Sequence, residues 1–516
     1  MTATPPSADS ALTAARRSRD LDTAGDEQVD LLVVGLGITG AGVALDAASR
    51  GLSVIAVDAH DLAFGTSRWS SKLVHGGLRY LAKGQVGVAR ESAVERGILM
   101  TRTAPHLTRA MPMVIPLTDA VSRQQGLLAM QGLRAGDLLR VAARTPRSLL
   151  PRPRRLDVDE TVAMVPPVRK QGLRGGLLSY DGQLEDDVRL VVAIARTAAA
   201  HGARILTRTR ALEVTGDGAL LRDELTGATV EVKARAVVNA AGVWAGQVVP
   251  DLRLMPSRGT HLVVRSDALP GVDVAVSAPV PGSINRFVFT LPQSDGVVYV
   301  GLTDEPAAGE IPDVPAAEDS EIEFLLHTIN TALVTPLTRA DILGTYSGLR
   351  PLLAAEGATS DLSRKHAVLT SDTGVVTVVG GKLTTYRKMA EDAVDEVVSS
   401  RGIEAGPCRT AQLPLVGAAP REELAALTAP ARLVRRYGAE APLVLQDAVD
   451  RTGHTPERLL APVAERIPVS RAELLWGVTH EGALDVDDLL DRRTRLGLVP
   501  EARASAEPAA VQALGG

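Results

Sequence analysis

The chain has little of several residue types, and each shortage excludes a class of protein. A single cysteine, Cys408, stands among 516 residues, so no disulfide framework, Cys-x-x-Cys redox pair or cysteine-ligated zinc site can form within the chain. We expect no metal centre. Aromatic residues make up 3% of the chain and the formal net charge is −5, which argues against nucleic acid as a partner. No apolar run reaches the length of about 18 residues that a transmembrane helix needs.

A glycine-rich turn follows the first apolar run. Residues 29–34 read as a buried strand, and residues 35–40 match Gly-x-Gly-x-x-Gly before an alanine-rich helical pattern. A second apolar run, residues 54–57, ends at Asp58, 18 residues after Gly40. That spacing is typical of the acid that binds a ribose, with the pyrophosphate at the helix N-terminus. A structural turn is the alternative, but the strand, helix and acid together favour a dinucleotide site.

Two further predicted strands, far downstream in the chain, end at glycine residues. Residues 236–242 end in Ala-Ala-Gly, and residues 374–381 end in Gly-Gly. Three such junctions, spread over about 350 residues, predict a cofactor domain assembled from discontinuous segments. A long, buried FAD suits this arrangement better than NAD, which usually needs one contiguous unit.

Residues 70–81 hold two adjacent glycines, Gly76 and Gly77, between a Lys/His pair and an Arg/Tyr pair. Without side chains, glycines let the backbone approach a flat ligand, and the flanking cations can hold an anion. The segment therefore indicates a place where a cofactor ring meets a charged substrate. A Gly-Gly turn followed by a surface helix is the alternative.

Four blocks of the chain resemble the FAD-dependent, respiratory and quinone-linked glycerol-3-phosphate dehydrogenases. They are residues 34–51, 70–81, 345–351 and 380–390, and the last is the most specific, with Gly-Gly-Lys, Thr-Tyr-Arg and then alanine at the family's spacing. The resemblance covers roughly residues 29–497, including residues 480–494. Leu36 stands where the family usually has glycine, but it occupies a variable position of the turn pattern.

The fold that we expect is α/β. It comprises an FAD-binding Rossmann-like domain of the glutathione-reductase or D-amino-acid-oxidase type, a mixed β-sheet substrate domain and a helical C-terminal domain. We place the oxidoreductase region at residues 28–410 and the helical domain at 411–500, between disordered tails at 1–27 and 501–516. The FAD-binding segments are predicted at about residues 28–115, 180–245 and 340–400, interleaved with substrate-domain segments.

The resemblance implies oxidation of sn-glycerol 3-phosphate at C2 to dihydroxyacetone phosphate. Hydride passes to flavin N5, a base takes the hydroxyl proton, and electrons continue to a membrane quinone. A phosphate carries a charge of about −1.5 to −2 and needs several cationic donors. The candidates are Arg79, Arg350 and Lys382, and the resemblance adds Tyr80 and His261 to the substrate side.

His261 is the candidate general base, because an imidazole pKa near 6.5 suits proton transfer at neutral pH. A hydrogen-bonded strand histidine is the alternative. Arg350 is the candidate for stabilising a developing alkoxide, so the identity of the base stays open. Motifs and resemblance together assign to FAD the residues Gly35, Gly37, Ile38, Thr39, Gly40, Asp58, Ser67, Ser71, Lys72, Leu73, His75, Gly76, Gly77, Ala240, Gly242, Gly348, Arg350, Gly381, Lys382, Leu383 and Thr384.

Residues 121–155 are locally basic, with eight arginines, one acid and interleaved leucines. A basic amphipathic helix of this kind can lie on an anionic membrane, and a solvated helical face is the alternative. We expect a cytoplasmic protein, peripheral on the inner face of the cytoplasmic membrane. A homodimer stays open.

Two other functions compete with the quinone-linked dehydrogenase. An oxidase of the same family would pass electrons to O2, and the sequence holds no acceptor-specific motif. An FAD-dependent tRNA-modifying protein also combines a glycine-rich turn with a helical C-terminal domain. The missing cysteine pairs, the acidic balance and the few aromatics argue against it.

Overall fold

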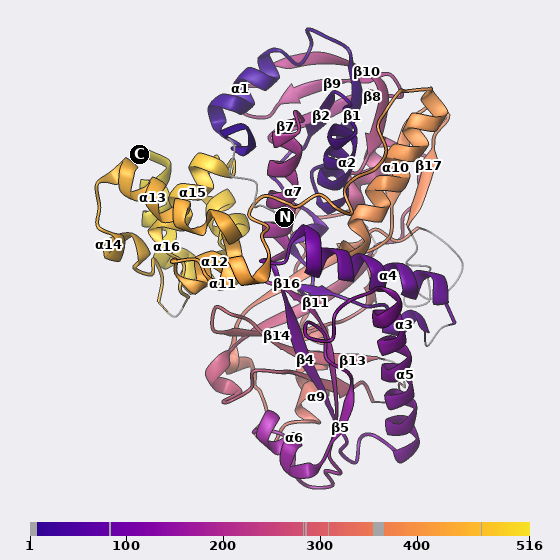
Figure 1. The fold of residues 1–516 in the computed structure, drawn as a ribbon, viewed down its shortest axis with the longest axis vertical. Helices are drawn as coiled ribbons and strands as arrows, with labels where there is room; N and C mark the ends of the chain where they lie inside the picture. Colours follow the sequence, from indigo (N-terminus) through magenta and orange to yellow (C-terminus); the bar gives the residue numbers. More distant parts are fainter. Residues whose placement is uncertain are drawn as a thin grey trace.

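The computed structural model describes residues 8–81, 84–281, 283, 286–307, 309–353, 366–465 and 467–515, without the side chain of Arg79. Figure 1 shows three parts: a domain around β1 at the top, a second sheet domain around β11 below it, and a helical group on the left. The α/β class and its three predicted parts are confirmed.

The upper sheet has the order β17-β18-β10-β1-β2-β7, and β8 and β9 extend it as a hairpin beside β10. Strand β1 is parallel to both of its neighbours, β10 and β2. A parallel strand covered on both faces reads as a continuous apolar run, which is why the sequence predicted it. The strands are β1 Val29–Val34, β2 Val54–Val57, β7 Arg204–Leu206, β8 Thr209–Thr215, β9 Gly218–Asp223, β10 Thr229–Asn239, β17 Ala367–Thr370 and β18 Val376–Val379.

Three helices form the core of this upper domain with the sheet: α2 Ile38–Ser49, α7 Asp187–Ala200 and α10 Tyr386–Arg401. Gly42 lets α2 and α10 pack closely, because a Cβ there would lie 3.0 Å from the Tyr386 ring. The α2 helix is thereby held firmly beneath the glycine-rich turn.

The lower sheet has the order β15-β11-β14-β13-β12-β4-β6-β3, with β16 beside β11 and β5 beside β6. Its pairs are antiparallel except β12 with β4, so the sheet is mixed, as predicted. The strands are β3 Leu73–Val74, β4 Thr108–Pro116, β5 Arg154–Leu156, β6 Gly176–Leu184, β11 Ser257–Arg265, β12 Ala275–Pro279, β13 Phe287–Pro292, β14 Val297–Gly301, β15 Glu305–Pro306 and β16 Ile342–Arg350.

Helices cover this sheet and join it to the upper domain. Helix α9 packs on one face through Leu325 and Ile329, and α5 runs along the right-hand side in Figure 1. The helices are α3 Leu78–Leu81, α4 Val86–Ile98, α5 Arg123–Ala142, α6 Val158–Met164, α8 Ala245–Val248 and α9 Asp319–Asn330.

Strands β4 and β16, which fall within the predicted FAD-binding segments, lie in the lower sheet. Strand β4 pairs with β6 along its whole length, and β16 pairs with β11, so both belong to the lower sheet. An apolar run indicates a strand but not its pairing partner, and the sequence could not place these two strands.

The C-terminal domain is helical and has its own core around Leu433, Tyr437 and Trp476. Buried ion pairs join it to the upper domain: Arg196 of α7 lies 2.7 Å from Glu440, and Arg189 lies 2.5 Å from Glu481. The helices are α11 Arg421–Ala425, α12 Ala431–Tyr437, α13 Ala441–Thr452, α14 Pro456–Leu460, α15 Arg471–His480 and α16 Pro500–Gly515.

The prediction of disordered tails is wrong for residues 8–27 and 501–515. Helix α1, Ala14–Asp22, is anchored by Arg17, whose Nε donates to the Thr207 carbonyl at 2.6 Å and which also pairs with Asp223. Helix α16 buries alanines three and four residues apart against the rest of its domain. The contacts of Arg17 could not be predicted, because its partners lie about 200 residues away in the chain.

Candidate active site

A cavity of about 1260 Å³ extends from the start of α2, between the two sheets, to the inner face of α5. Nearly all the predicted site residues line it, although they come from segments far apart in the chain. Gly40, Lys72 and Gly76 do not line it, and the Arg79 side chain lies outside the described residues. The discontinuous segments that the sequence assigned to a cofactor are therefore brought together around one cavity.

The glycine-rich turn brings the N-terminus of α2 to this cavity. Gly35 has a φ of +103°, and a Cβ there would lie 2.6 Å from the Ala240 carbonyl oxygen. A Cβ on Gly40 would lie 1.8 Å from the Gly35 carbonyl oxygen, so Gly40 shapes the turn although it does not line the cavity. The first turn of a helix leaves N–H groups without intrahelical partners, which suits a phosphate.

Asp58 follows β2 at the same end of the cavity. Its Oδ2 accepts from the Leu36 amide at 2.7 Å and its Oδ1 from the His60 amide at 2.9 Å. Burial raises the pKa of Asp58 to about 6, against the lowering effect of these two amides. The carboxylate is thus fixed in place where the motif predicts a ribose ligand.

Residues 61–72, which we call the cofactor loop, connect β2 to β3 along one wall. Ser67 Oγ accepts from the Ile38 amide at 2.8 Å, and Trp69 packs so closely on Gly348 that a Cβ there would lie 2.6 Å from the Trp69 Cβ. The loop therefore touches both the dinucleotide end and the lower sheet.

Lys72, which the resemblance assigned to FAD, does not line the cavity. Its side chain is buried away from the cavity, 3.0 Å from the Asp187 carboxylate, and donates to the carbonyls of Arg68 and Ser70. Burial lowers the pKa of Lys72 to about 8, and the charge of Asp187 opposes that effect. Lys72 therefore stabilises the loop on the side that faces away from the cavity.

The glycine pair is held by Asp181 of β6. The Asp181 carboxylate lies 3.0 Å from His75 Nδ1 and accepts from Arg96 Nη1 at 2.6 Å and from the Gly76 amide at 3.1 Å. Burial alone would raise the pKa of Asp181, but the Arg96 charge and the His75 contact bring it down to about 2. Gly76 leaves room for Arg96, and only Gly77 reaches the cavity.

His261 lies on β11 and contacts the cofactor loop. Its Nε2 is 2.8 Å from Ser71 Oγ, and its ring stacks on Tyr346 with the ring centres 4.6 Å apart. Its buried Nδ1 has no hydrogen-bond partner among the described residues. Burial, with the charges of Lys72 and Arg350, lowers the pKa of His261 well below 6.5, so the imidazole is neutral at physiological pH.

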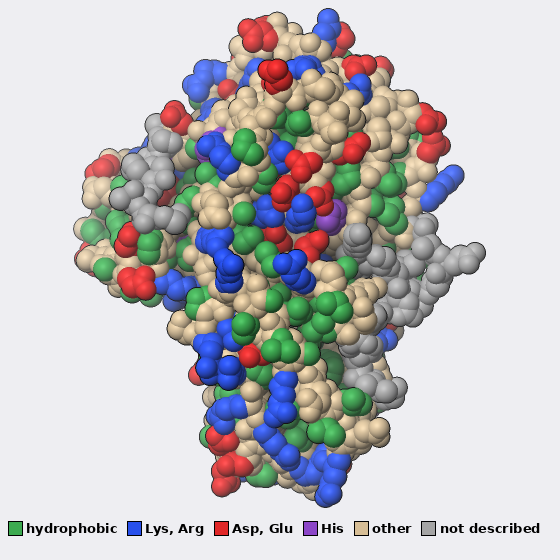
Figure 2. All heavy atoms as spheres, turned by 45° about the vertical axis from the view of Figure 1, so that its right-hand side comes forward, with side chains coloured by type: hydrophobic (Ala, Val, Ile, Leu, Met, Phe, Trp, Pro, Cys, Tyr) green, Lys and Arg blue, Asp and Glu red, His purple; other side chains and the backbone are tan. Residues whose placement is uncertain are grey.

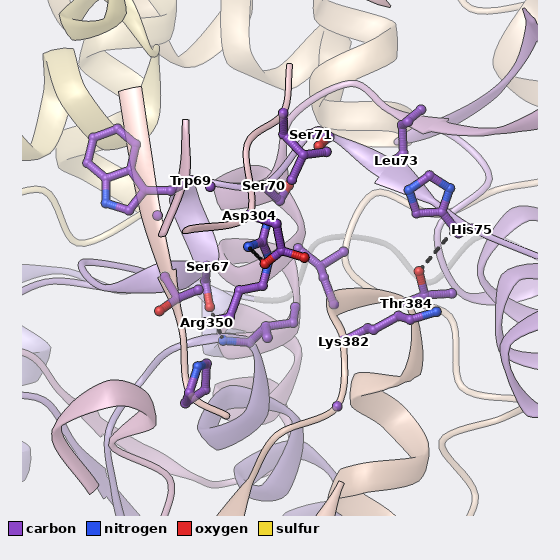
Figure 3. A pocket seen from close by; sticks show the side chains of 18 of the residues that line it. Ser67, Trp69, Ser70, Ser71, Leu73, His75, Asp304, Arg350, Lys382 and Thr384 are labelled. Atoms are coloured by element: carbon purple, nitrogen blue, oxygen red, sulfur yellow. Dashed lines mark hydrogen bonds and ion pairs between the residues drawn. The ribbon is translucent and has the colours of Figure 1, made fainter. Parts of the chain in front are cut away.

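Two cations line the reacting end of the cavity (Figure 3). Arg350 Nη1, at the end of β16, donates to Asp304 Oδ1 at 3.0 Å and to Ser257 Oγ at 3.1 Å. Lys382, next to η7 Leu383–Thr385, lies with Nζ 3.8 Å from the centre of the Tyr80 ring. This end can hold an anion beside a neutral base.

Sequence reasoning missed Asp304, Asp181 and Trp69. Asp304 follows an apolar run at residues 297–302. An acidic residue after a predicted strand was the one sequence feature that could have indicated a site residue here. Asp181 and Trp69 carried no such signal.

Comparison with known proteins decides the family. The model of the FAD-dependent oxidoreductases matches residues 30–387, and that of the C-terminal domain of alpha-glycerophosphate oxidase matches residues 408–516. Glycerol-3-phosphate dehydrogenase 1 of Mycobacterium tuberculosis is 55% identical over 96% of each chain. The chain belongs to the FAD-dependent glycerol-3-phosphate dehydrogenase family. The family's cofactor is FAD, and the glycine cradle, the α2 N-terminus and the long cavity fit it.

Other members of the family and proteins of the same fold agree with this. The aerobic glycerol-3-phosphate dehydrogenase of Staphylococcus aureus is 36% identical over 76% of this chain and 72% of its own. The FAD complex of the Bacillus halodurans glycerol-3-phosphate dehydrogenase superposes with a TM-score of 0.74 at 27% identity, covering 98% of this chain and 94% of that one. L-alpha-glycerophosphate oxidase of Mycoplasma pneumoniae shares the fold, with a TM-score of 0.57 at 18% identity over 74% of this chain and 96% of that one. Since the chain belongs to this family, the alternative of a tRNA-modifying protein is rejected.

Proposed function

We propose that this chain oxidises sn-glycerol 3-phosphate to dihydroxyacetone phosphate and passes the electrons to a membrane quinone. The observation that carries the proposal is that Arg350, Lys382 and neutral His261 all line the FAD-type cavity. A small anionic alcohol fits this set, because two cations bind its phosphate or alkoxide and the imidazole can take its proton.

FAD, when bound, supplies the hydride acceptor. The turn at Gly35 and Gly37 would hold its pyrophosphate, and Asp58 would bind its ribose. Ser71 orients His261 through the bond to Nε2, and burial keeps the imidazole neutral, so it can accept the hydroxyl proton. Arg350, itself oriented by Asp304, stabilises the negative charge that develops on the substrate oxygen.

The electron acceptor defines two versions of this function. A quinone is the acceptor that we propose. O2 is the second candidate, since the family model that matches residues 408–516 is described from an oxidase. Oxygen consumption with stoichiometric hydrogen peroxide would identify the oxidase, whereas reduction of a soluble quinone without peroxide supports the dehydrogenase.

A surface beside the cavity supports a lipid-soluble acceptor. Helix α5 exposes Leu127 and Leu138, and Figure 2 shows arginine and apolar side chains gathered on the lower half of this face. Among the described residues no helix is both long and apolar enough to cross a bilayer. We propose peripheral attachment to an anionic membrane through this basic and apolar face, on the cytoplasmic side.

The substrate proposal is tested by adding glycerol 3-phosphate to the FAD-loaded protein without oxygen. We expect loss of the flavin absorbance near 450 nm, on the order of one equivalent per active site, by the family's hydride chemistry. Glycerol and glycerol 2-phosphate serve as controls, since neither offers the same alcohol and phosphate arrangement. An unchanged spectrum with glycerol 3-phosphate would refute the proposal.

A further inference from the structure

The cofactor loop, residues 61–72, has two sides. Phe64, Ser67, Trp69 and Ser71 line the cavity. The Asp61 carboxylate and the Arg68 carbonyl instead accept hydrogen bonds from arginine side chains of the C-terminal domain. The loop therefore lies between the cofactor site and the C-terminal domain, none of whose described residues lines the cavity.

Asp61, at the start of the loop, is fully buried and held by two consecutive arginines of η9 Asp488–Arg493. Arg492 Nε donates to Oδ2 at 2.7 Å, and Arg493 donates to both oxygens, at 2.7 and 2.8 Å. Burial alone would raise the pKa of Asp61, but the Arg493 and Arg492 charges hold it well below its usual range. A buried carboxylate with such partners fixes its backbone firmly.

Arg495 reaches the centre of the loop. Its Nη2 donates to the Arg68 carbonyl at 2.5 Å, and its guanidinium lies 5.4 Å from the Trp69 ring centre. Lys72 Nζ donates to the same carbonyl at 3.0 Å. The peptide between Arg68 and Trp69 is thus held from behind by two buried cations, next to the side chains that line the cavity.

A further connection leads from this loop to the base. Ser71 belongs to the loop and bonds His261 Nε2 at 2.8 Å. A shift of the loop backbone would therefore change both the cavity wall at Ser67 and Trp69 and the orientation of the imidazole. Positioning of this kind matters because reacting groups displaced by about 1 Å lose much of their effect.

We propose that Arg495 is a positioning residue of the active site, and that the helical C-terminal domain acts as a clamp on the cofactor loop. The clamp holds the backbone at Arg68 so that Ser67, Trp69 and Ser71 keep their places. The inference rests on the proposed placement of FAD against this loop, but it assigns no role to the substrate.

The test compares Arg495→Met with Glu440→Gln in the full-length, FAD-loaded protein. Glu440→Gln removes a charge from the Arg196–Glu440 pair, which joins the same domains without touching the loop. Amide hydrogen exchange in peptides covering residues 61–72 and the FAD dissociation constant are measured in both. Loss of one charge-assisted bond predicts, for Arg495→Met alone, about tenfold faster exchange there and about tenfold weaker FAD binding.

Arg495→Lys keeps a cation able to donate to the Arg68 carbonyl and should restore part of both quantities. If Arg495→Met does not fold, the same two measurements on Arg495→Lys test the clamp. Exchange and FAD affinity equal to those of the Glu440→Gln variant, in whichever Arg495 variant folds, would overturn the clamp. Neither measurement uses substrate, so a protein that fails to react with glycerol 3-phosphate would refute the proposed function and leave this test intact.

Discussion

Ser71 Oγ and His261 Nε2 lie 2.8 Å apart, which joins the cofactor loop to the lower sheet at the reacting end of the cavity. The bond fixes an imidazole that burial and two nearby cations keep neutral. In the resting protein the imidazole is therefore unprotonated at physiological pH and is available to accept the substrate proton.

The first prediction concerns the pH dependence of the reaction. Since the pKa of His261 lies well below 6.5, its proton-accepting form persists as pH falls through 6.5. We measure the rate of anaerobic flavin bleaching at saturating substrate. As pH falls, protonation of His261 should decrease this rate only below pH 6.5, and we call this decrease the acid limb. His261→Asn should be slower by about 10²-fold or more and lack that limb. An acid limb at or above pH 6.5 that disappears in His261→Asn would contradict the assignment.

Arg350→Ala should reduce kcat with glycerol 3-phosphate by about 10²- to 10³-fold, the effect of losing one donor to a developing oxyanion. FAD should stay bound, which the visible spectrum reports. Arg350→Lys should recover little, because one ammonium cannot replace both Nη1, which donates to Ser257 and Asp304, and Nη2, which donates to the Thr303 carbonyl. Arg265→Gln is the matched control, since that arginine ends β11 in a partly exposed pair with Asp341. Near-normal kcat/KM in Arg350→Ala would refute the role.

Gly259→Ala tests how Arg350 is accommodated. A Cβ at Gly259 would lie 2.3 Å from Arg350 Nη2, so the guanidinium must move. We expect a loss of at least about tenfold in kcat/KM with FAD affinity retained, because a displaced donor loses alignment. Gly87→Ala, where an added Cβ meets nothing within 4 Å, is the control and should leave activity unchanged. Equal activity of the two variants would show that Arg350 tolerates displacement.

Local sequence patterns predicted those parts of the fold and of the site that are formed by a single continuous segment of the chain. The glycine turn at residues 35–40 and the acid at Asp58 follow from the geometry of strand, turn, helix and strand. Partners from distant segments could not be predicted this way. Asp304 lies 46 residues before Arg350, and Asp223 lies 206 residues after Arg17. The same limit applies to the placement of Lys72 against Asp187 and to the N-terminal tail, where Arg17 binds distant segments.

Membrane attachment through α5 is tested by flotation with liposomes rich in anionic lipid. Leu127→Glu with Leu138→Glu should reduce binding by about tenfold or more, because exposed apolar side chains and arginines act together at a lipid surface. Leu225→Glu with Val511→Glu changes equally exposed residues outside α5 and should bind normally. Failure of the unchanged protein to float, at low salt as well, would argue against a lipid-binding face.

Asp58 makes a prediction about FAD affinity. Its pKa in the FAD-free protein is raised to about 6 by burial, and only the ionised carboxylate is a pure acceptor for ribose hydroxyls. FAD binding should therefore release a proton below pH 6, so affinity should increase by about tenfold between pH 5 and 7 and then level off. Fluorescence titration of FAD-free protein at a series of pH values measures this.

Asp58→Asn should weaken FAD binding at pH 7 and remove most of the pH dependence, because the amide does not titrate. Asp30→Asn is the control: Asp30 lies on β1 of the same sheet, pairs with Ser53 and Arg235, and does not line the cavity. It should leave the affinity curve unchanged. If Asp58→Asn keeps the full increase between pH 5 and 7, another group releases the proton and Asp58 is not the ribose ligand.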